Sequence, residues 1–424
     1  MVRYSNPLSY PPCRFFNLLD MCQSIIGKLP EECLQHIFTQ CLSSQPFSPP
    51  TKEAAPLLLI QVCKSWRKVG LSTAELWCSL DFASCQFSEK DVEFLASWLK
   101  RSGDCRPLCI RLALRSEYYS DDEGEGQIVR CIFNESAAKA LGIFLSCLGR
   151  WQQAELVWEW SELPLPAVAC SVPKLETFTL KAINAPLEKT KTSINHLLHD
   201  APKLRRFELS NGQEGLTSQM PTPLLLPWTK ILHLGLDYEM SLTECIEKLR
   251  QCEILETAIF RRIGRLPAEI PDNQIIYPLI RLNRLEVSSV EDLSPLLASL
   301  RLPSLHRIRI EMGWEEAEEP AGDVDEWPHT AFREMLHESH CQIMDLEMIG
   351  PLQEEDLIQC LLDVSVTLQN LYLGEAISVS PRTFDLLTKV DLFPNLILFS
   401  PSQSIPPVWQ EMFLARNVNI ANQY

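Results

Sequence analysis

The sequence predicts an α/β protein that joins a small helical module to a solenoid of short parallel strands with outer helices. Three observations predict this fold. Two apolar helical segments lie within residues 29–77, an apolar strand pattern recurs through residues 172–373, and helix-like segments separate its copies. The expected boundaries are an N-terminal arm at 1–25, the helical module at 26–82 and the solenoid at 83–424.

The helical module begins with one amphipathic helix. Leu29, Leu34, Ile37 and Phe38 recur at helical spacing and form one apolar stripe. Pro30 suits the first turn, where its missing N–H loses no hydrogen bond, and the two glutamates after it interact favourably with the helix dipole. The segment 43–56 holds four prolines and therefore predicts a loop.

A second helix is expected over residues 57–69. Its apolar residues, which include Val62, Cys63 and Trp66, cover more surface than one partner helix needs. Units of this size are marginally stable, and surplus apolar surface on them indicates a binding partner. The alternative is an ordinary helical hairpin packed on the rest of the chain, and periodicity alone leaves both interpretations open.

The order of these residues resembles an F-box, the helical module that docks proteins onto cullin–RING ubiquitin ligases. The motif elements are Leu29-Pro30, Ile37-Phe38, Val62-Cys63-x-x-Trp66-Arg67 and Leu76-Trp77. The length of the loop 43–56 and the segments around it resemble the large F-box families of mushroom-forming fungi. The resemblance implies a Skp-family adaptor as partner. The residues that it places at the adaptor are Leu29, Pro30, Leu34, Ile37, Phe38, Val62, Cys63, Trp66, Leu76 and Trp77.

The rest of the chain carries a degenerate repeat of the form Leu-x-x-Leu-x-Leu. Its copies start at positions 175, 204, 231, 255, 282 and 305, which lie 29, 27, 24, 27 and 23 residues apart, and later copies start at 343 and 368. Weaker copies stand at 109–114 and 151–156. Leucine-rich repeats have periods of about 20–29 residues, so the spacing favours that architecture. The alternative is an ordinary α/β domain whose strands share a pattern.

Helix-like segments lie between the expected strands. They occupy 193–199, 241–251, 292–300, 354–363 and 381–390, and Ser193 and Ser241 are expected helix caps. Strand–helix alternation in one direction builds a parallel sheet with helices on its other face. Each unit cannot bury its apolar face alone, so we expect neighbouring units to stack.

The composition excludes several partners. The net charge of −17 argues against nucleic acid and anionic membrane surfaces, because both bind through lysine and arginine. The 16 cysteines lack the framework of a small secreted domain, and we expect them to act as small buried apolar residues in a reducing compartment. The longest uncharged apolar stretch, 140–149, is about half a membrane span. A cytoplasmic or nuclear protein is therefore expected.

Candidate chemical sites are weak. His337, His340 and Cys341 have ligand types suited to zinc but lack a second paired motif, so no metal or other cofactor is expected. The sequence contains no Gly-x-Ser-x-Gly, phosphate-binding glycine loop or His-Glu-x-x-His motif, which argues mildly against an enzyme.

The gap of 38 residues between positions 305 and 343 predicts an inserted acidic loop. As a target-binding rim it would attract a basic segment, and the alternative is a solvated insertion. The expected contact residues are Trp314, Glu315, Glu316, Glu318, Glu319 and Trp327.

The F-box resemblance implies the substrate-recognition subunit of an SCF-type ubiquitin ligase. The module would bind a Skp-family adaptor, and through it a cullin, while the solenoid holds a target protein. One alternative is an adaptor-bound interaction scaffold without ubiquitin transfer. The other is an enzyme on an α/β scaffold, which a deep pocket with convergent titratable groups would favour.

Overall fold

The computed structural model describes most of the chain. The described residues are 29–84, 88–114, 135–159, 165–166, 168–183, 185–212, 222–264, 278–313, 327–374, 376–401 and 405–421. They fall into two compact units. Those of the first unit lie within Met1–Ala83, Phe87–Arg111 and Asn134–Ser146, and those of the second lie within Ser84–Gln86, Leu112–Phe133 and Cys147–Tyr424.

The first unit is mainly helical. Its elements are α2 (Glu31–Gln40), α3 (Leu59–Val62), α4 (Lys64–Ser72), the 3₁₀ turn η1 (Ala74–Trp77), β1 (Ser79–Ser84), α5 (Glu89–Arg101) and α6 (Glu135–Ser146). The predicted helix at 29–42 is confirmed by α2, which starts directly after Pro30. The predicted loop at 43–56 is also confirmed, because no helix or strand lies between α2 and α3.

The expectation of one continuous second helix was wrong. The backbone of Cys63 is extended, with φ −158° and ψ 172°, so the helix breaks into α3 and α4. The Cys63 Sγ accepts a hydrogen bond from the backbone N–H of Trp66 at 3.5 Å. A residue that caps a helix adopts this extended conformation, so Cys63 ends one apolar segment and starts the next.

Two tryptophans organise the core of the first unit. Trp77 is fully buried, and its indole N–H donates to the carbonyl oxygen of Gly70 at 2.9 Å. Its ring meets that of Trp98 on α5 edge-on, with centroids 4.8 Å apart. The packing of this unit therefore continues past residue 82 into α5.

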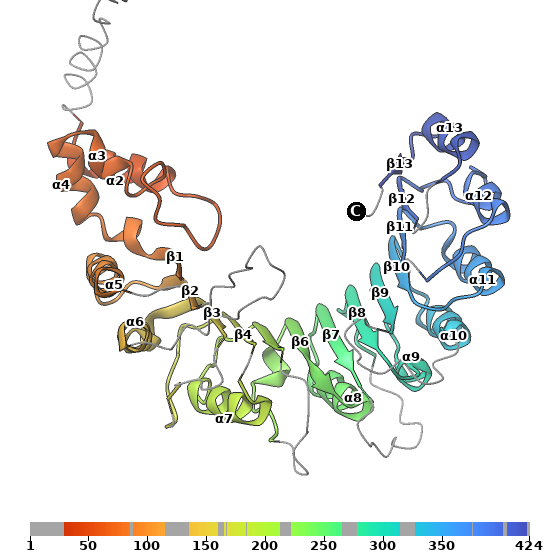
Figure 1. Cartoon of the computed structure of the whole chain (residues 1–424), viewed down its shortest axis with the longest axis horizontal. Helices are drawn as coiled ribbons and strands as arrows, with labels where there is room; N and C mark the ends of the chain where they lie inside the picture. Colours follow the sequence, from red (N-terminus) through yellow and green to blue (C-terminus); the bar gives the residue numbers. More distant parts are fainter. Residues whose placement is uncertain are drawn as a thin grey trace, which may run out of the picture. The chain divides into compact units, whose positions relative to one another are not determined.

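In the second unit, strands β3 to β13 lie side by side in a sheet whose strand order follows chain order (Figure 1). All pairings from β3 onward are parallel, and most neighbouring strands pair without a shift. The strands after β1 are β2 (Leu108–Leu114), β3 (Trp151–Trp158), β4 (Thr177–Ala182), β5 (Arg206–Asn211), β6 (His233–Met240), β7 (Thr257–Ile263), β8 (Arg284–Ser289), β9 (Arg307–Met312), β10 (Asp345–Ile349), β11 (Asn370–Leu373), β12 (Leu398–Ser400) and β13 (Asn419–Ile420).

The repeat pattern located the central strands well. Strands β4 to β11 confirm the eight predicted copies, and each begins two residues after the first leucine or isoleucine of its copy. The weaker copies at 109–114 and 151–156 coincide with β2 and β3. The pattern missed β1 in the first unit and the last two strands of the second unit, β12 and β13.

Helices of the second unit follow one face of its sheet (Figure 1). They are α7 (Leu187–Leu197), α8 (Leu242–Gln251), α9 (Ser294–Ser299), α10 (His329–Ser339), α11 (Glu354–Val364), α12 (Pro381–Leu387) and α13 (Pro407–Ala415). The predicted segments at 241–251, 292–300, 354–363 and 381–390 are confirmed by α8, α9, α11 and α12. None of the helices in the described part of the chain is long and apolar enough to cross a membrane.

The two predicted caps had different outcomes. The Ser241 Oγ accepts a hydrogen bond from the backbone N–H of Glu244 at 3.1 Å, so this cap is confirmed. Ser193 is not a cap, because α7 already begins after Pro186 and places Ser193 inside the helix. Proline is a common helix start, and here it precedes the serine that the pattern favoured.

Alternating side chains of each strand divide the second unit into a core and an open face, which is the face opposite the helices. In β5, Phe207 and Leu209 are buried, whereas Arg206 and Glu208 are partly exposed. The rings of Phe178 and Phe207 on neighbouring strands are stacked, with centroids 6.3 Å apart. The core is thus a layer of side chains matched from strand to strand.

A buried ion network joins α7, α8 and β6. Lys191 is only 2% exposed, and its Nζ lies 3.5 Å from the Oε1 of Glu244 and 3.9 Å from that of Glu188. The Nζ also lies 4.7 Å from the ring centre of Tyr238, whose hydroxyl donates to Glu244 at 3.0 Å. Burial and the neighbouring Glu244 raise the pKa of Tyr238. A buried charge needs such partners, so the network fixes the two helices on the sheet.

The cysteines fit the expectation of small buried residues only in part. Cys245, Cys252 and Cys360 are buried, and burial raises the pKa of Cys252 and of Cys360 to about 12. Cys33 was expected in the same class, but its side chain is exposed on α2. Leu34 and Phe38 form the buried stripe of α2, and the helical period turns Cys33 away from that stripe toward solvent.

We predict that Phe207→Ala lowers the free energy of unfolding of the second unit by about 3–5 kcal/mol, because it removes a fully buried aromatic ring. Glu208→Gln, on the open face of the same strand, should change it by less than about 1 kcal/mol. Urea unfolding followed by circular dichroism measures both. Equal effects of the two substitutions would contradict the assignment of the faces.

Candidate interaction surfaces

The ten residues that the sequence places at an adaptor divide into three groups by exposure. Four are buried inside the first unit, namely Leu34, Phe38, Leu76 and Trp77. Two are half-buried, namely Cys63 and Trp66. Four are exposed, namely Leu29, Pro30, Ile37 and Val62. The motif therefore mixes residues that hold the unit together with residues that face outward.

The buried members pack against one another. Phe38 has no exposed surface, and its ring lies 4.9 Å from that of Trp66 between centroids. Together with Trp77 these aromatic rings link α2, α4 and η1. Truncating these aromatic side chains would remove contacts in the core of the first unit. Their role in the fold is therefore enough to account for their presence in the motif.

Exposed apolar side chains form a second set on the same helices. On α2, Ile37 is 44% exposed and lies one turn from the exposed thiols of Cys33 and Cys41. At α3, Leu58, which directly precedes the helix, and Val62, its last residue, are 45% and 51% exposed and lie one turn apart. We call this set of five side chains the apolar surface of the first unit.

A hollow lies beside this surface. Its volume is about 430 Å³, and its lining comes from the end of α2, the proline-rich loop and the start of α3. Cys41 and Leu58 belong to both the hollow and the apolar surface. A side chain from a partner helix could enter there, because helix-in-groove contacts use apolar pockets of this kind.

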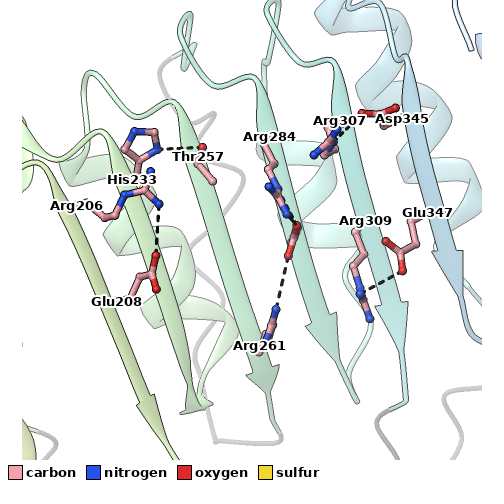
Figure 2. A network of polar contacts seen from close by, with 11 residues as sticks. Arg206, Glu208, His233, Thr257, Arg261, Arg284, Arg307, Arg309, Asp345 and Glu347 are labelled. Carbon is pink, nitrogen blue, oxygen red and sulfur yellow. Dashed lines mark hydrogen bonds and ion pairs between the residues drawn. The ribbon is translucent and has the colours of Figure 1, made fainter. Parts of the chain in front are cut away.

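The open face of the second unit carries several charged residues, which stand at the first and third positions of its strands among uncharged ones. In the first row, Arg206, His233, Thr257, Arg284, Arg307, Asp345 and Asn370 are neighbours in register. In the second row, Glu208, Gly235, Ile259, Glu286, Arg309, Glu347 and Tyr372 follow in the same way. Figure 2 shows most of these side chains on adjacent strands.

Glu286 lies at the centre of this charged array. Its carboxylate accepts a hydrogen bond from Arg284 Nε at 2.7 Å and lies 3.9 Å from Arg261 Nη2. Its side chain is buried, whereas both arginines are largely exposed. One sheltered carboxylate thus holds a hydrogen-bonded guanidinium group and lies near a second one at the surface.

Strands β9 and β10 continue the array (Figure 2). Arg307 Nε donates to the Asp345 carboxylate at 2.7 Å. Arg309 lies 3.1 Å from Glu347 and 3.0 Å from Glu311, so it bridges two carboxylates. Neighbouring strands are therefore joined by charge pairs across the open face.

A hollow of about 210 Å³ lies within the array. It is lined by Arg284, Glu286, Arg307, Ile308, Arg309, Asp345, Leu346, Glu347, Asn370 and Tyr372. These residues belong to β8, β9, β10 and β11. The hollow is thus open to solvent on the face that the helices leave uncovered, with polar groups along its walls.

Two titratable groups of the array have shifted pKa values. Burial raises the pKa of Glu347, and the nearby charge of Arg309 opposes this shift. Burial also lowers the pKa of His233, with a further lowering by the charge of Arg206. Both shifts favour the neutral form of the group concerned.

The predicted acidic target-binding rim lies mostly outside the described residues. Trp314, Glu315, Glu316, Glu318 and Glu319 are in the segment 314–326, which the structure does not describe. Trp327 is described, and it is 1% exposed with its ring edge-on to Phe332 at 5.3 Å. Its side chain is part of the core beside α10 and does not face a partner.

Metal-ligand types do not converge in the described residues. His337 and His340 have ring centroids 6.1 Å apart at the end of α10. No group of three or more histidine, cysteine, aspartate or glutamate side chains suited to a metal occurs among residues that the structure describes.

Comparisons with known proteins leave the family of this chain open. No protein-family model matches it, and no curated protein matches it. It is similar to the crystal structure of a Bacteroides fragilis protein solved as a structural-genomics target, with a TM-score of 0.32 and 12% sequence identity. The match covers 59% of this chain and 66% of that protein, just under two thirds of its length.

Sequence reasoning had not singled out the charged array of the open face. The available signal was the recurrence of charged residues two positions apart inside the repeat copies, as in Arg206-x-Glu208, Arg284-x-Glu286 and Asp345-x-Glu347. Residues two apart on a strand share a face, so this pattern places charges on one face. Their pairing across strands depends on register, which one copy alone does not reveal.

We predict that Glu347→Gln alters the pH dependence of stability. Because the folded-state pKa of Glu347 is raised, its stabilising contribution is full below the unfolded-state pKa and is lost as pH rises through the folded-state value. Glutamine resembles the protonated form at every pH. The free energy of unfolding of the variant, relative to the native protein, should therefore increase as pH rises above the ordinary pKa of a glutamate and through the raised folded-state value.

Urea titrations at several pH values measure this difference. Glu355→Gln is the matched control, since Glu355 forms an exposed ion pair with Arg382 on the helical side. A relative stability of Glu347→Gln that falls as pH rises would mean that the pair with Arg309 outweighs the burial of the carboxyl group.

Proposed function

We propose that this chain is the substrate-recognition subunit of an SCF-type ubiquitin ligase. In this proposal the first unit is an F-box that binds a Skp-family adaptor, and the second unit is a leucine-rich-repeat-like solenoid that holds a target. The observation that carries the proposal is the match of four F-box motif elements to α2, the start of α4 and η1, combined with exposed apolar side chains on α2 and α3.

The exposed apolar surface supports binding of a protein partner. Ile37, Leu58 and Val62 are large side chains that stay about half exposed in the chain alone. Burying a fully exposed side chain of this kind contributes about 1.5–3 kcal/mol, so covering the remaining half of each of these three contributes about 1 kcal/mol per side chain to a protein–protein affinity. The adjacent hollow of about 430 Å³ offers a place for a partner side chain.

The repeat architecture of the second unit supports target binding. Stacked strand–helix units offer a long surface whose residues can vary while the core stays packed. A ligase of this type accelerates transfer by holding the target close to a reactive thioester on another subunit. The second unit then needs no catalytic group of its own.

The alternative of an interaction scaffold also includes binding of the adaptor, but it does not include recruitment of a cullin. If the chain only uses the adaptor as a structural partner, it will copurify with the adaptor but without a cullin. If it is a ligase receptor, a cullin will copurify through the adaptor. Affinity purification from the source cells, with residues 27–80 deleted as a control, separates the two.

We predict that Ile37→Asp and Val62→Asp each abolish binding of a purified Skp-family adaptor, because a charge would be buried without a partner at the interface. Both positions are exposed in the chain alone, so the thermal unfolding temperature should change little. Val366→Asp is the matched control, since Val366 is 67% exposed in the second unit.

Pull-down and isothermal titration calorimetry measure the binding. Adaptor binding that survives both substitutions would refute the placement of the interface. Phe38→Asp is not informative here, because Phe38 is fully buried and its substitution would disturb the fold.

We also predict that adaptor binding protects two cysteines from alkylation. Cys33 and Cys41 flank Ile37 on the apolar surface, whereas Cys105 is exposed in the segment after α5. Mass spectrometry after a short iodoacetamide pulse should show slower labelling of Cys33 and Cys41 in the complex and unchanged labelling of Cys105. Equal labelling of all three thiols with and without adaptor would count against this interface.

A further inference from the structure

The open face between β7 and β10 is electrically neutral within a strongly acidic chain. It carries four arginines, Arg261, Arg284, Arg307 and Arg309, and four carboxylates, Glu286, Glu311, Asp345 and Glu347. The whole chain has a net charge of −17. Since exposed charges act over roughly 8–10 Å in physiological salt, the balanced charges of this face repel an acidic partner less than the net charge of the chain suggests.

Two arginines of this face stand side by side. Arg284 and Arg307 are directly paired in register on β8 and β9, and their side chains are 40% and 50% exposed. Like charges at directly opposite positions of neighbouring strands are unfavourable unless anions lie close to them. Glu286 and Asp345 each engage one of the two, and a further anion between them would be favourable.

Each of these guanidinium groups keeps donors for a ligand. Arg284 uses Nε and Nη2 on Glu286, and Arg307 uses Nε and Nη2 on Asp345. Within the described residues, Nη1 of Arg284 and Nη1 of Arg307 make no hydrogen bond. Arginine donors arranged as a fork match a carboxylate, so two such groups at the edge of a hollow form an anion-binding arrangement.

The hollow beside them has a suitable size and lining. Its volume of about 210 Å³ exceeds that of a single water molecule, which is about 30 Å³, several-fold. Three arginines and three carboxylates line it together with Asn370 and Tyr372, and the carboxylates Glu286, Asp345 and Glu347 each contact one or more of the arginines. The hollow is therefore large enough to admit a carboxylate side chain from a partner beside these two arginines.

A second basic position lies three strands away in the same row. Arg206 is followed in register by His233, Thr257 and Arg284. Adjacent strands are about 4.8 Å apart, so three steps span about 14 Å. An extended chain advances about 3.3–3.4 Å per residue, so four residues cover nearly the same distance.

We propose that the open face binds an extended acidic segment of the target that crosses the strands. One carboxylate binds Arg284 at the edge of the hollow, next to Arg307, and a second, four residues away, reaches Arg206. This inference builds on the proposed role of the second unit as the target-binding part, and it names the chemistry of that target. The charge of this target segment is negative, whereas the acidic segment 314–326 had favoured a target segment of positive charge.

A short peptide probe tests this proposal on the full chain. The probe is a fluorescein-labelled Gly/Ser peptide with two glutamates four residues apart. Matched probes carry glutamine at both positions, lysine at both positions, or the two glutamates adjacent to each other. Fluorescence anisotropy in low salt should give the tightest binding for the first probe, and binding should weaken with added salt.

Paired variants locate the site. Arg284→Gln combined with Arg307→Gln should weaken binding of the glutamate probe by about tenfold or more, because charge-assisted hydrogen bonds are lost. Arg382→Gln removes an arginine from an exposed ion pair on α12 and should leave binding unchanged. Arg284→Lys with Arg307→Lys keeps the charge and should give an intermediate affinity, which provides a readout if the glutamine variant unfolds.

Several outcomes would overturn the proposal. These are equal binding of the glutamate and glutamine probes, tighter binding of the lysine probe, equal binding of the adjacent-glutamate probe, or native affinity in the folded double glutamine variant. The proposed docking of the first unit is measured separately with the adaptor. The arginine variants should bind the adaptor normally, so failure of one proposal is distinguishable from failure of the other.

Discussion

The register of the parallel strands is the constraint on which the second unit depends. Each central strand begins two residues after the leading apolar residue of its repeat copy, and neighbouring strands then pair residue by residue. This register aligns buried side chains such as Phe178 and Phe207 into a continuous layer. It also leaves one face of every strand uncovered by helices. A shift of one residue would exchange the two faces and bury the charged rows.

The same constraint arranges the polar groups of the open face. Because positions one and three of each strand face outward, charges that are distant in sequence become neighbours across the sheet. Glu286 and Arg309 each contact charged groups from other positions and bridge them. The first unit is held together differently. Its buried aromatic rings pack the short helices together, and Ile37 and Val62 remain exposed to solvent. Both units thus separate the residues that maintain the fold from those that face outward.

The parts of the fold that sequence reasoning recovered are those with a strong repeated signal. Eight strands, the cap at Ser241 and the loop between α2 and α3 follow from apolar spacing, a capping hydroxyl and prolines. The break at Cys63 was missed because a capping thiol looks apolar in a helical pattern. The burial of Trp327 was missed because its neighbours in sequence are charged, whereas its contact is Phe332 on α10. The charged array depends on pairing between copies, and spacing within one copy cannot reveal it.

Each of the strands β4 to β11 begins two residues after the leading apolar residue of its repeat copy. Because this offset is constant, insertions between copies and substitutions within strands have different consequences. Insertions between a strand and the next leading residue, such as the long segment before β10, leave the register of the following strand intact. Substitutions at positions one and three change only the open face. A gene that encodes such a protein can therefore acquire new recognition properties by point mutation or by insertion, while selection on stability acts on a different set of codons. Rapid divergence of the outward positions beside a slowly changing core is the expected evolutionary pattern.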